Sequence, residues 1–178
     1  MLSNRQNGII RKKIDGDFEE IWKRLLDIVA AEKIPVFAVI DHKSNALQVG
    51  LDMTDARVLI FGNPAVGTVL MQSNPEIALD LPLKFLVWKS SDGVILSWNS
   101  PTWLAERFEM NPNMEVIKKI NNLLEKLSNS IAAVWKGKRF CKYCSKMFKR
   151  RITTYNSKKN PLKVHLFIRT VGKHMTDL

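Results

Sequence analysis

Residues 83–98 read LKFLVWKSSDGVILSW, and this stretch decides the fold class. Two apolar runs, residues 83–88 and 94–98, flank the turn residues Ser91-Asp92-Gly93. Such a pattern predicts a β-hairpin, because glycine after aspartate supplies the positive φ that a tight turn requires. The expected sheet is therefore antiparallel at this point.

Three further segments have the length and composition of strands. Gly8–Ile14 precedes a turn, and residues 36–40 and 57–61 are apolar runs of strand length. Short apolar runs of this kind are typical of buried strands, so both are expected in the interior of the sheet. These segments and the hairpin are the strands expected to form the sheet.

Helix signals separate the strands. Asp17, followed by Glu20 three positions later, has the spacing of a capping box and starts a helix with an apolar stripe. Lys43–Gly50 is expected to be a short helix that turns Ala46, Leu47 and Val49 inward. Further helices are expected around Gly67–Ser73 and after three cap-plus-proline pairs, at residues 74–75, 100–101 and 111–112.

The last of these pairs begins the longest predicted helix. An apolar residue recurs on one face of it over about six turns, which favours packing onto the sheet; a dimer-forming helix is the alternative. The stripe comprises Val116, Ile120, Leu123, Leu124, Leu127, Ile131 and Val134. The sequence therefore predicts an α+β fold, with an antiparallel sheet covered by helices, a long C-terminal helix and a basic, mostly irregular tail.

The charge divides the chain into two parts. Residues 1–135 carry 15 Lys and Arg against 16 Asp and Glu, whereas residues 136–178 carry 13 Lys and Arg against the single acid Asp177. We expect a nearly neutral domain over residues 1–135 and a basic appendage over residues 136–178. No apolar run approaches the roughly 20 residues of a membrane span, and the N-terminal residues lack a signal-peptide core, so a cytoplasmic location without membrane association is expected.

Several short blocks of the first hundred residues form a recurring signature. They are Ile40-Asp41-His42, residues 59–64, Gly67-Thr68, Met71-Gln72 and residues 78–84. In order and spacing they resemble the family called domain of unknown function 302, over about residues 8–101. The resemblance implies an α+β fold with an antiparallel sheet covered by helices, often seen as a homodimer. It implies no activity.

The same blocks contain candidate ligand-binding residues. Asp41, His42 and Asn63 follow predicted strands, where sites are often built. Thr68 lies at the expected start of a helix, whose free N–H groups would suit an anion, and Asp80 follows soon after. A small-ligand pocket combining these five residues is one hypothesis. The alternative is local structure, in which His42 and Asp80 serve as caps and Asn63 as a turn residue.

Catalysis is not indicated by these residues. The domain has no cysteine and no Gly-x-Ser-x-Gly motif, and acid–base work by Asp41, His42 and Asp80 requires that folding bring them together. Whether the protein is an enzyme is therefore left open, and no cofactor is expected for residues 1–135.

The basic tail contains a second resemblance. Cys141 and Cys144, followed by Phe148, resemble the opening of a two-Cys, two-His zinc finger, in which two thiolates bind zinc at about 2.3 Å. Leu162 and His165 resemble the helix of such a finger. The intervening residues 145–164 are too many, however, and Arg169 stands where the second histidine should be. His174 is the substitute, which would give the ligand set Cys141, Cys144, His165 and His174.

Four interpretations of the tail remain. It is a degenerate finger, a working zinc site, an unstructured basic segment, or a redox-active cysteine pair. Its excess of basic residues would attract nucleic acid non-specifically by charge. A zinc-binding, nucleic-acid-associated protein is thus the alternative function, and a working finger would favour a nuclear location.

Overall fold

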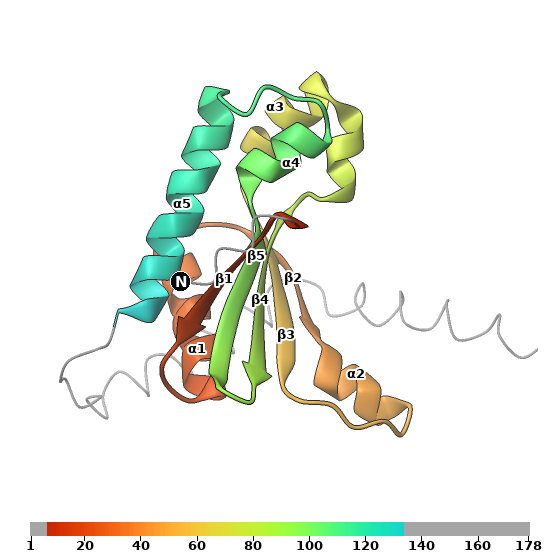
Figure 1. Cartoon of the computed structure of the whole chain (residues 1–178), viewed down its shortest axis with the longest axis vertical. Helices are drawn as coiled ribbons and strands as arrows, with labels where there is room; N and C mark the ends of the chain where they lie inside the picture. Colours follow the sequence, from red (N-terminus) through yellow and green to blue (C-terminus); the bar gives the residue numbers. More distant parts are fainter. Residues whose placement is uncertain (1–6, 134–178) are drawn as a thin grey trace, which may run out of the picture. The chain divides into compact units, whose positions relative to one another are not determined.

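The structure, a computed structural model, describes residues 7–133. Its centre is a five-stranded antiparallel sheet with the strand order β1-β5-β4-β3-β2 (Figure 1). The strands are β1 (Ile9–Ile14), β2 (Val36–Asp41), β3 (Ala56–Phe61), β4 (Leu83–Ser90) and β5 (Gly93–Asn99). All the predicted strands are present, and the predicted α+β class is confirmed.

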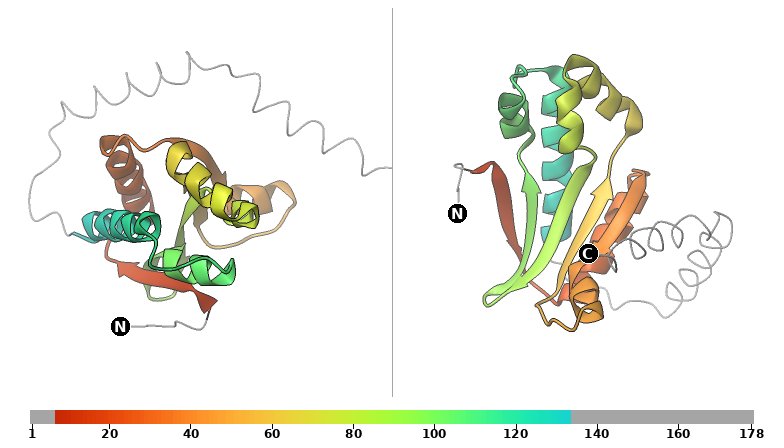
Figure 2. Two further views of the ribbon diagram at one scale, coloured as in Figure 1. Left: turned by 90° about the horizontal axis from the view of Figure 1, so that it is seen from above. Right: turned by 90° about the vertical axis from the view of Figure 1, so that its right-hand side faces the viewer.

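The helices occupy distinct places around this sheet. Helix α1 (Phe18–Ala31) and helix α5 (Glu115–Ala132) pack together beside the strands (Figures 1 and 2). At one end of the sheet lie α3 (Pro64–Ser73), the 3₁₀ helix η2 (Pro75–Leu79) and α4 (Pro101–Arg107). Helix α2 (His42–Gln48) lies at the opposite end, beside the beginning of β3.

The core forms between the sheet and its helices. Leu59, Phe61, Phe85 and Leu96 are fully buried, and β3 and β4 are in register so that Leu59 lies opposite Phe85. The Phe85 ring stacks on Phe61 with the centroids 5.1 Å apart, and its edge meets Trp98 at 5.5 Å. Helices α1 and α5 complete this core with Leu25, Leu124 and other buried residues of their apolar stripes. Burial of these side chains is the main stabilising contribution to the fold.

The start and turn signals act locally. Asp17 accepts hydrogen bonds from the N–H groups of Glu19 and Glu20 and so caps α1. The Glu20 side chain accepts no hydrogen bond within residues 7–133, so only the Asp17 half of the predicted capping box is formed. Ser100 accepts one from Trp103 N–H and caps α4. Gly93 has a φ of 127° where β5 begins after the turn, which explains the glycine at this position.

Two expectations about burial are wrong. Strand β2 is the edge of the sheet, and Val36, Phe37 and Val39 are exposed instead of buried. In helix α2, which contains no buried residue, Leu47 is 58% exposed, and Val49 just after it is 71% exposed. Apolar runs predict strands and helices regardless of whether a neighbour covers them, so the sequence could not reveal that this part of the domain projects from the core.

Two helix boundaries also differ from expectation. Helix α3 begins at Pro64 rather than at Gly67, because the side chain of Asn63 accepts a hydrogen bond from Ala65 N–H. Helix α5 begins at Glu115, since Asn111 caps a separate turn through Asn113 N–H. In both cases an asparagine-proline pair is present, but only the first one opens the helix directly.

Candidate functional site

The five predicted ligand-binding residues do not come together. Strands β2 and β3 are antiparallel, with Val36 opposite Phe61 and Asp41 opposite Arg57. Asn63 therefore lies near the beginning of β2, whereas Asp41 and His42 lie at its other end. Five residues of strand separate the two places by about 17 Å. The single pocket expected to combine these residues is consequently not formed.

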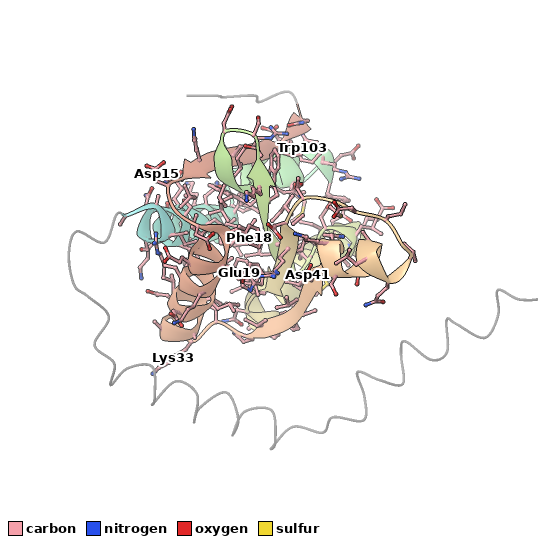
Figure 3. All side chains as sticks on the ribbon, turned by 90° about the horizontal axis from the view of Figure 1, so that it is seen from below. Asp15, Phe18, Glu19, Lys33, Asp41 and Trp103 are labelled. Atoms are coloured by element: carbon pink, nitrogen blue, oxygen red, sulfur yellow. The ribbon has the colours of Figure 1, made fainter. Side chains whose placement is uncertain are left out.

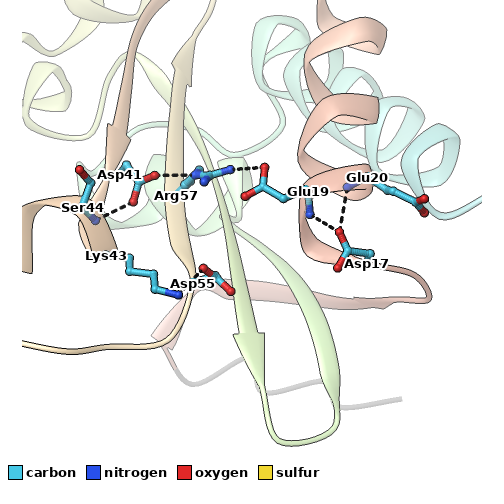
Figure 4. Close-up of polar contacts among 8 residues, drawn as sticks. All are labelled: Asp17, Glu19, Glu20, Asp41, Lys43, Ser44, Asp55 and Arg57. Atoms are coloured by element: carbon cyan, nitrogen blue, oxygen red, sulfur yellow. Dashed lines mark hydrogen bonds and ion pairs between the residues drawn. The ribbon is translucent and has the colours of Figure 1, made fainter. Parts of the chain in front are cut away.

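Asp41 belongs to a polar network with Arg57 and Glu19 (Figure 4). Arg57 donates from Nε to Asp41 Oδ2 at 2.7 Å and from a terminal nitrogen to Glu19 Oε2 at 2.8 Å. The guanidinium also lies over the Phe18 and Trp22 rings, at 5.1 and 5.8 Å from their centroids. Figure 3 shows Phe18, Glu19 and Asp41 close together at this end of the molecule. The network thus joins β2, β3 and α1.

The second oxygen of Asp41 caps helix α2. It accepts a hydrogen bond from Ser44 N–H at 2.9 Å, and this bond together with Arg57 lowers the pKa of the carboxyl. The Glu19 and Asp41 carboxylates in turn raise the pKa of Arg57. A second ion pair, Lys43 to Asp55 at 3.0 Å, links α2 to the segment before β3 and raises the pKa of Lys43. These contacts hold α2 in place and engage the carboxylates of Asp41 and Asp55 in ion pairs.

His42 is the first residue of α2 and is exposed. Its side chain makes no hydrogen bond to another residue of the described part of the chain, so the expected role of this side chain as a cap is absent there. Asp80 lies at the far end of the sheet and pairs with Arg107 at 2.9 Å, while its backbone oxygen accepts from Lys84 Nζ at 2.7 Å. Asp41, His42 and Asp80 therefore form no catalytic cluster.

An apolar pocket of about 280 Å³ lies at the end of the sheet occupied by α3. Helix α3 and residues 78–83, which lead from η2 to the first residue of β4, contribute most of its wall, and α5 contributes Ile120 and Leu123. Phe37, on the bulge of β2, forms part of its rim. The lining residues are Phe37, Gly62, Asn63, Pro64, Val66, Gly67, Thr68, Leu70, Met71, Ala78, Leu81, Pro82, Leu83, Ile120 and Leu123.

Two of the predicted site residues, Asn63 and Thr68, line this pocket and are its polar side chains. The Asn63 oxygen is used by the cap of α3, whereas its amide nitrogen donates to no other side chain or backbone group within residues 7–133. The Thr68 hydroxyl donates to Pro64 C=O at 2.8 Å and keeps its acceptor capacity. The pocket therefore offers one donor and one acceptor on an otherwise apolar surface.

The anion site expected at Gly67-Thr68 does not exist in the predicted form. Gly67 N–H donates to Asn63 C=O at 3.0 Å within the first turn of α3, so this N–H is not free. Gly67 instead shapes the pocket, since a Cβ at this position would lie 4.0 Å from Leu81 and Met71 side-chain atoms that line it.

The sequence pattern does not distinguish most residues of the pocket wall from core residues. Leu81, Leu83 and Leu123 read as core residues, because an apolar side chain gives the same pattern whether it faces a core or an empty space. The signature blocks at residues 59–64, 67–68, 71–72 and 78–84 nevertheless cover much of the wall. Their concentration around one place was the available signal.

The described residues contain no metal-binding group. Within residues 7–133, no three His, Cys, Asp or Glu side chains are arranged to hold a metal ion. The predicted zinc ligands Cys141, Cys144, His165 and His174 lie outside the described residues. Among the helices of the described part, none is long and apolar enough to cross a membrane.

Known proteins are similar in sequence to this domain. The chain is 33% identical over 117 residues to the fluoride-specific ion channel FluC 1 of Brucella suis biovar 1 (strain 1330), a match covering 65% of this chain and 46% of that protein. FluC 1 of Brucella abortus biovar 1 (strain 9-941) matches with the same identity over 43% of its length. The matched region is thus less than half of these relatives.

The fold also has a solved counterpart. The crystal structure of an uncharacterised conserved protein from Bacillus stearothermophilus superimposes with a TM-score of 0.63 at 19% sequence identity. The match covers 70% of this chain and 98% of that one. The model of the family described as "Domain of unknown function DUF302" matches residues 10–131, which extends the resemblance seen in residues 8–101 through α5. The chain belongs to the DUF302 family.

Proposed function

We propose that the domain binds a small, largely apolar molecule in the pocket between α3, the start of β4 and α5. The observation that carries the proposal is the pocket itself, about 280 Å³ in volume and lined almost wholly by apolar side chains. Ligand sites typically combine such a lining with a few polar groups that orient the ligand. Asn63 and Thr68 are suited to that role.

The lining favours an uncharged ligand. It includes no Lys, Arg, His, Asp or Glu, so a charged group buried there would lack a partner and would cost several kcal/mol. A carbonyl or hydroxyl group facing Asn63 and Thr68 would be compensated by hydrogen bonds. The relatives named as fluoride channels do not alter this proposal, because the pocket offers no cation to hold a fluoride ion.

A fluorescent probe tests the proposal without knowledge of the natural ligand. N-phenyl-1-naphthylamine is uncharged, apolar and brighter in an apolar site, and we expect saturable binding of it by the full-length chain. Gly67→Phe should abolish this binding by filling the pocket. Gly67→Ala is the matched control, because its added Cβ makes only ordinary contacts with Leu81 and Met71.

The polar end of the pocket is tested by Asn63→Ser. Serine also caps a helix, so α3 should be retained, while the amide donor is lost. We expect unchanged binding of the apolar probe and weaker displacement of it by competitors that carry a carbonyl. Equal probe binding by the wild type and Gly67→Phe would reject the pocket as the binding site.

A further inference from the structure

Helices α1 and α5 cover only one face of the sheet, the face that carries Leu59, Phe85 and Leu96 (Figure 2). Successive side chains of a strand point to opposite faces, and directly opposite partners on neighbouring strands share a face. The strand register therefore assigns a second set of side chains to the other face. We call its six large apolar members the outer patch: Ile40, Val58, Ile60, Leu86, Trp88 and Ile95. Within residues 7–133, none of the six belongs to the buried core or packs against it.

The outer patch departs from the pattern of a sheet face that meets water. Such a face normally carries polar side chains, which alternate with the apolar ones that point to the core. On β3, however, Val58 and Ile60 point outward on either side of the buried Leu59, and on β4 the outward side chains include Leu86 and Trp88. All four outward side chains are half-buried. A contiguous apolar patch of this kind is suited to a partner that covers it.

The Trp88 ring is held against the sheet. Its indole N–H donates to Ser97 Oγ on β5 at 3.1 Å, and Ser97 is buried. A partner that covered the ring would therefore leave no indole N–H unpaired. Trp88 is the single aromatic residue of the outer patch, whereas single-stranded nucleic acids stack successive bases on several rings. The patch consequently fits an apolar protein surface better than a nucleic acid.

The backbone around the outer patch favours a helix as the partner. Strands β3, β4 and β5 each have a neighbouring strand on both sides, so their N–H and C=O groups are used within the sheet. An extended segment laid on this face would have its own backbone groups buried without partners, whereas an α-helix satisfies them internally. The axes of β3 and β5 lie about 10 Å apart, since neighbouring strands are about 4.8 Å apart. This width matches the helix diameter of about 10–12 Å.

The charge beside the outer patch is positive. Arg11 and Lys13 on β1 share its face, and Lys84 on β4 adds a third cation, which donates to a backbone oxygen at 2.7 Å. Asp41 is the single acid in the five strands, and it pairs with Arg57 toward the opposite face. The partner is therefore expected to carry carboxylates on the side that lies over β1.

The spacing of the two β1 cations defines this acidic side further. Arg11 and Lys13 stand two residues apart on one strand, which separates them by about 7 Å. Residues four apart on a helix lie about 6 Å from each other on its surface. A helix aligned with β1 could therefore place carboxylates at positions i and i+4 against both cations.

We infer that the outer patch docks an amphipathic helix of a partner protein, whose apolar stripe is flanked on one side by carboxylates at i, i+4 spacing. Burial of the apolar stripe would supply most of the affinity, and the charges would orient the helix and select the partner. This inference goes beyond the proposed ligand binding and does not depend on it, because the outer patch shares no residue with the pocket.

A synthetic peptide tests the inference, with the indole N–H signal of Trp88 in the NMR spectrum of the full-length chain as the reporter. The signal is identified by its loss in Trp88→Phe. The acidic peptide, about 18 residues or five turns long, has a leucine stripe with glutamates at i, i+4 spacing along one side. The basic peptide has lysines in their place. We expect a saturable shift of the Trp88 signal with the acidic peptide, and binding of the basic peptide that is at least about tenfold weaker.

Reversal of the charge on β1 tests the orientation of the helix. Lys13→Glu should remove most of the preference for the acidic peptide, and Arg11→Glu combined with Lys13→Glu should reverse it. Lys12→Glu is the matched control, because Lys12 points to the other face, where it donates to Asn129. It should leave the preference unchanged. Every variant keeps the basic residues 136–178, so attraction of the peptide by those residues would not respond to Lys13.

The apolar contribution is tested by Leu86→Glu, which should weaken binding of the acidic peptide at least about tenfold. Circular dichroism should show that this variant folds, and its binding of N-phenyl-1-naphthylamine should be unchanged. The absence of a saturable Trp88 shift would overturn the inference. So would equal effects of Lys12→Glu and Lys13→Glu on the preference, or tighter binding of a single-stranded oligonucleotide than of the acidic peptide at Trp88.

Discussion

Replacement of Arg57 by methionine should destabilise the domain by about 2–4 kcal/mol. The ion pair with Glu19 contributes at most about 1 kcal/mol, because that carboxylate is 65% exposed. The bond to Asp41 is more protected, with side chains 21% and 31% exposed, and a hydrogen bond to a charged group there is worth about 1.5–3 kcal/mol. The contacts with the Phe18 and Trp22 rings add about 0.5–1 kcal/mol, which methionine partly preserves through its apolar stem.

Urea unfolding at neutral pH measures this loss as a lower midpoint with an unchanged slope. Two variants serve as controls. Arg57→Lys keeps the charge but not the forked geometry, so it should fall between the wild type and Arg57→Met. Asp41→Asn keeps the acceptor for Ser44 N–H but places an amide donor against Arg57 Nε–H, so it should lose the charged hydrogen bond to Arg57 and keep the cap of α2.

The pH dependence gives a second check on the same prediction. The folded-state pKa of Asp41 lies below its ordinary value of 3.8, so its contribution is fully present above pH 3.8. The contribution is lost as the pH falls through the folded-state pKa. The difference between the wild type and Arg57→Met should therefore narrow on acidification. If the unfolding free energies of the wild type and Arg57→Met differ by less than about 0.5 kcal/mol at neutral pH, the contacts of Arg57 do not stabilise the domain, since ordinary surface substitutions fall in that range.

Three other predictions follow from the packing and the charges. Leu59→Ala, in the fully buried core, should cost about 2–5 kcal/mol in urea unfolding. Val39→Ala, on half-exposed β2, is its control and should cost under about 0.5 kcal/mol. Asp27→Asn should raise stability at neutral pH, because burial raises the folded-state pKa of Asp27 and so disfavours its charged form. The gain in stability should shrink as the pH falls through that raised pKa. Urea unfolding of the wild type and Asp27→Asn over a series of acidic pH values checks this prediction. Gly67→Ala should raise the thermal midpoint, by up to about 1 kcal/mol in stability, because alanine is the better helix former.

The sequence predicted the positions of the helices and strands better than it predicted which of their side chains are buried. Asp17, Ser100 and Gly93 act through local hydrogen bonds and backbone angles, so the few residues around each of them were sufficient. Burial of Val36 and Val39 depends on strand order, which places β2 at the edge. Strand order is set by long-range packing, and nothing within residues 36–40 encodes it.

Only part of the candidate site could be predicted, again because the arrangement of the strands is set by long-range packing. Asn63 and Thr68 were identified because they stand beside a strand end and a helix start, and both line the pocket. His42 was grouped with them because it also follows a strand. The antiparallel register separates the two strand ends, and a pocket that combined them would have required parallel strands.

The most direct test of the pocket is a methyl NMR titration of the full-length chain with N-phenyl-1-naphthylamine. We predict that the largest shifts fall on pocket methyl groups, those of Met71, Leu81 and Ile120, and that Gly67→Phe removes them. Shifts confined to Val39 and Leu47, which are exposed on β2 and α2, would contradict the proposal that the ligand binds in the pocket. So would the absence of any saturable shift.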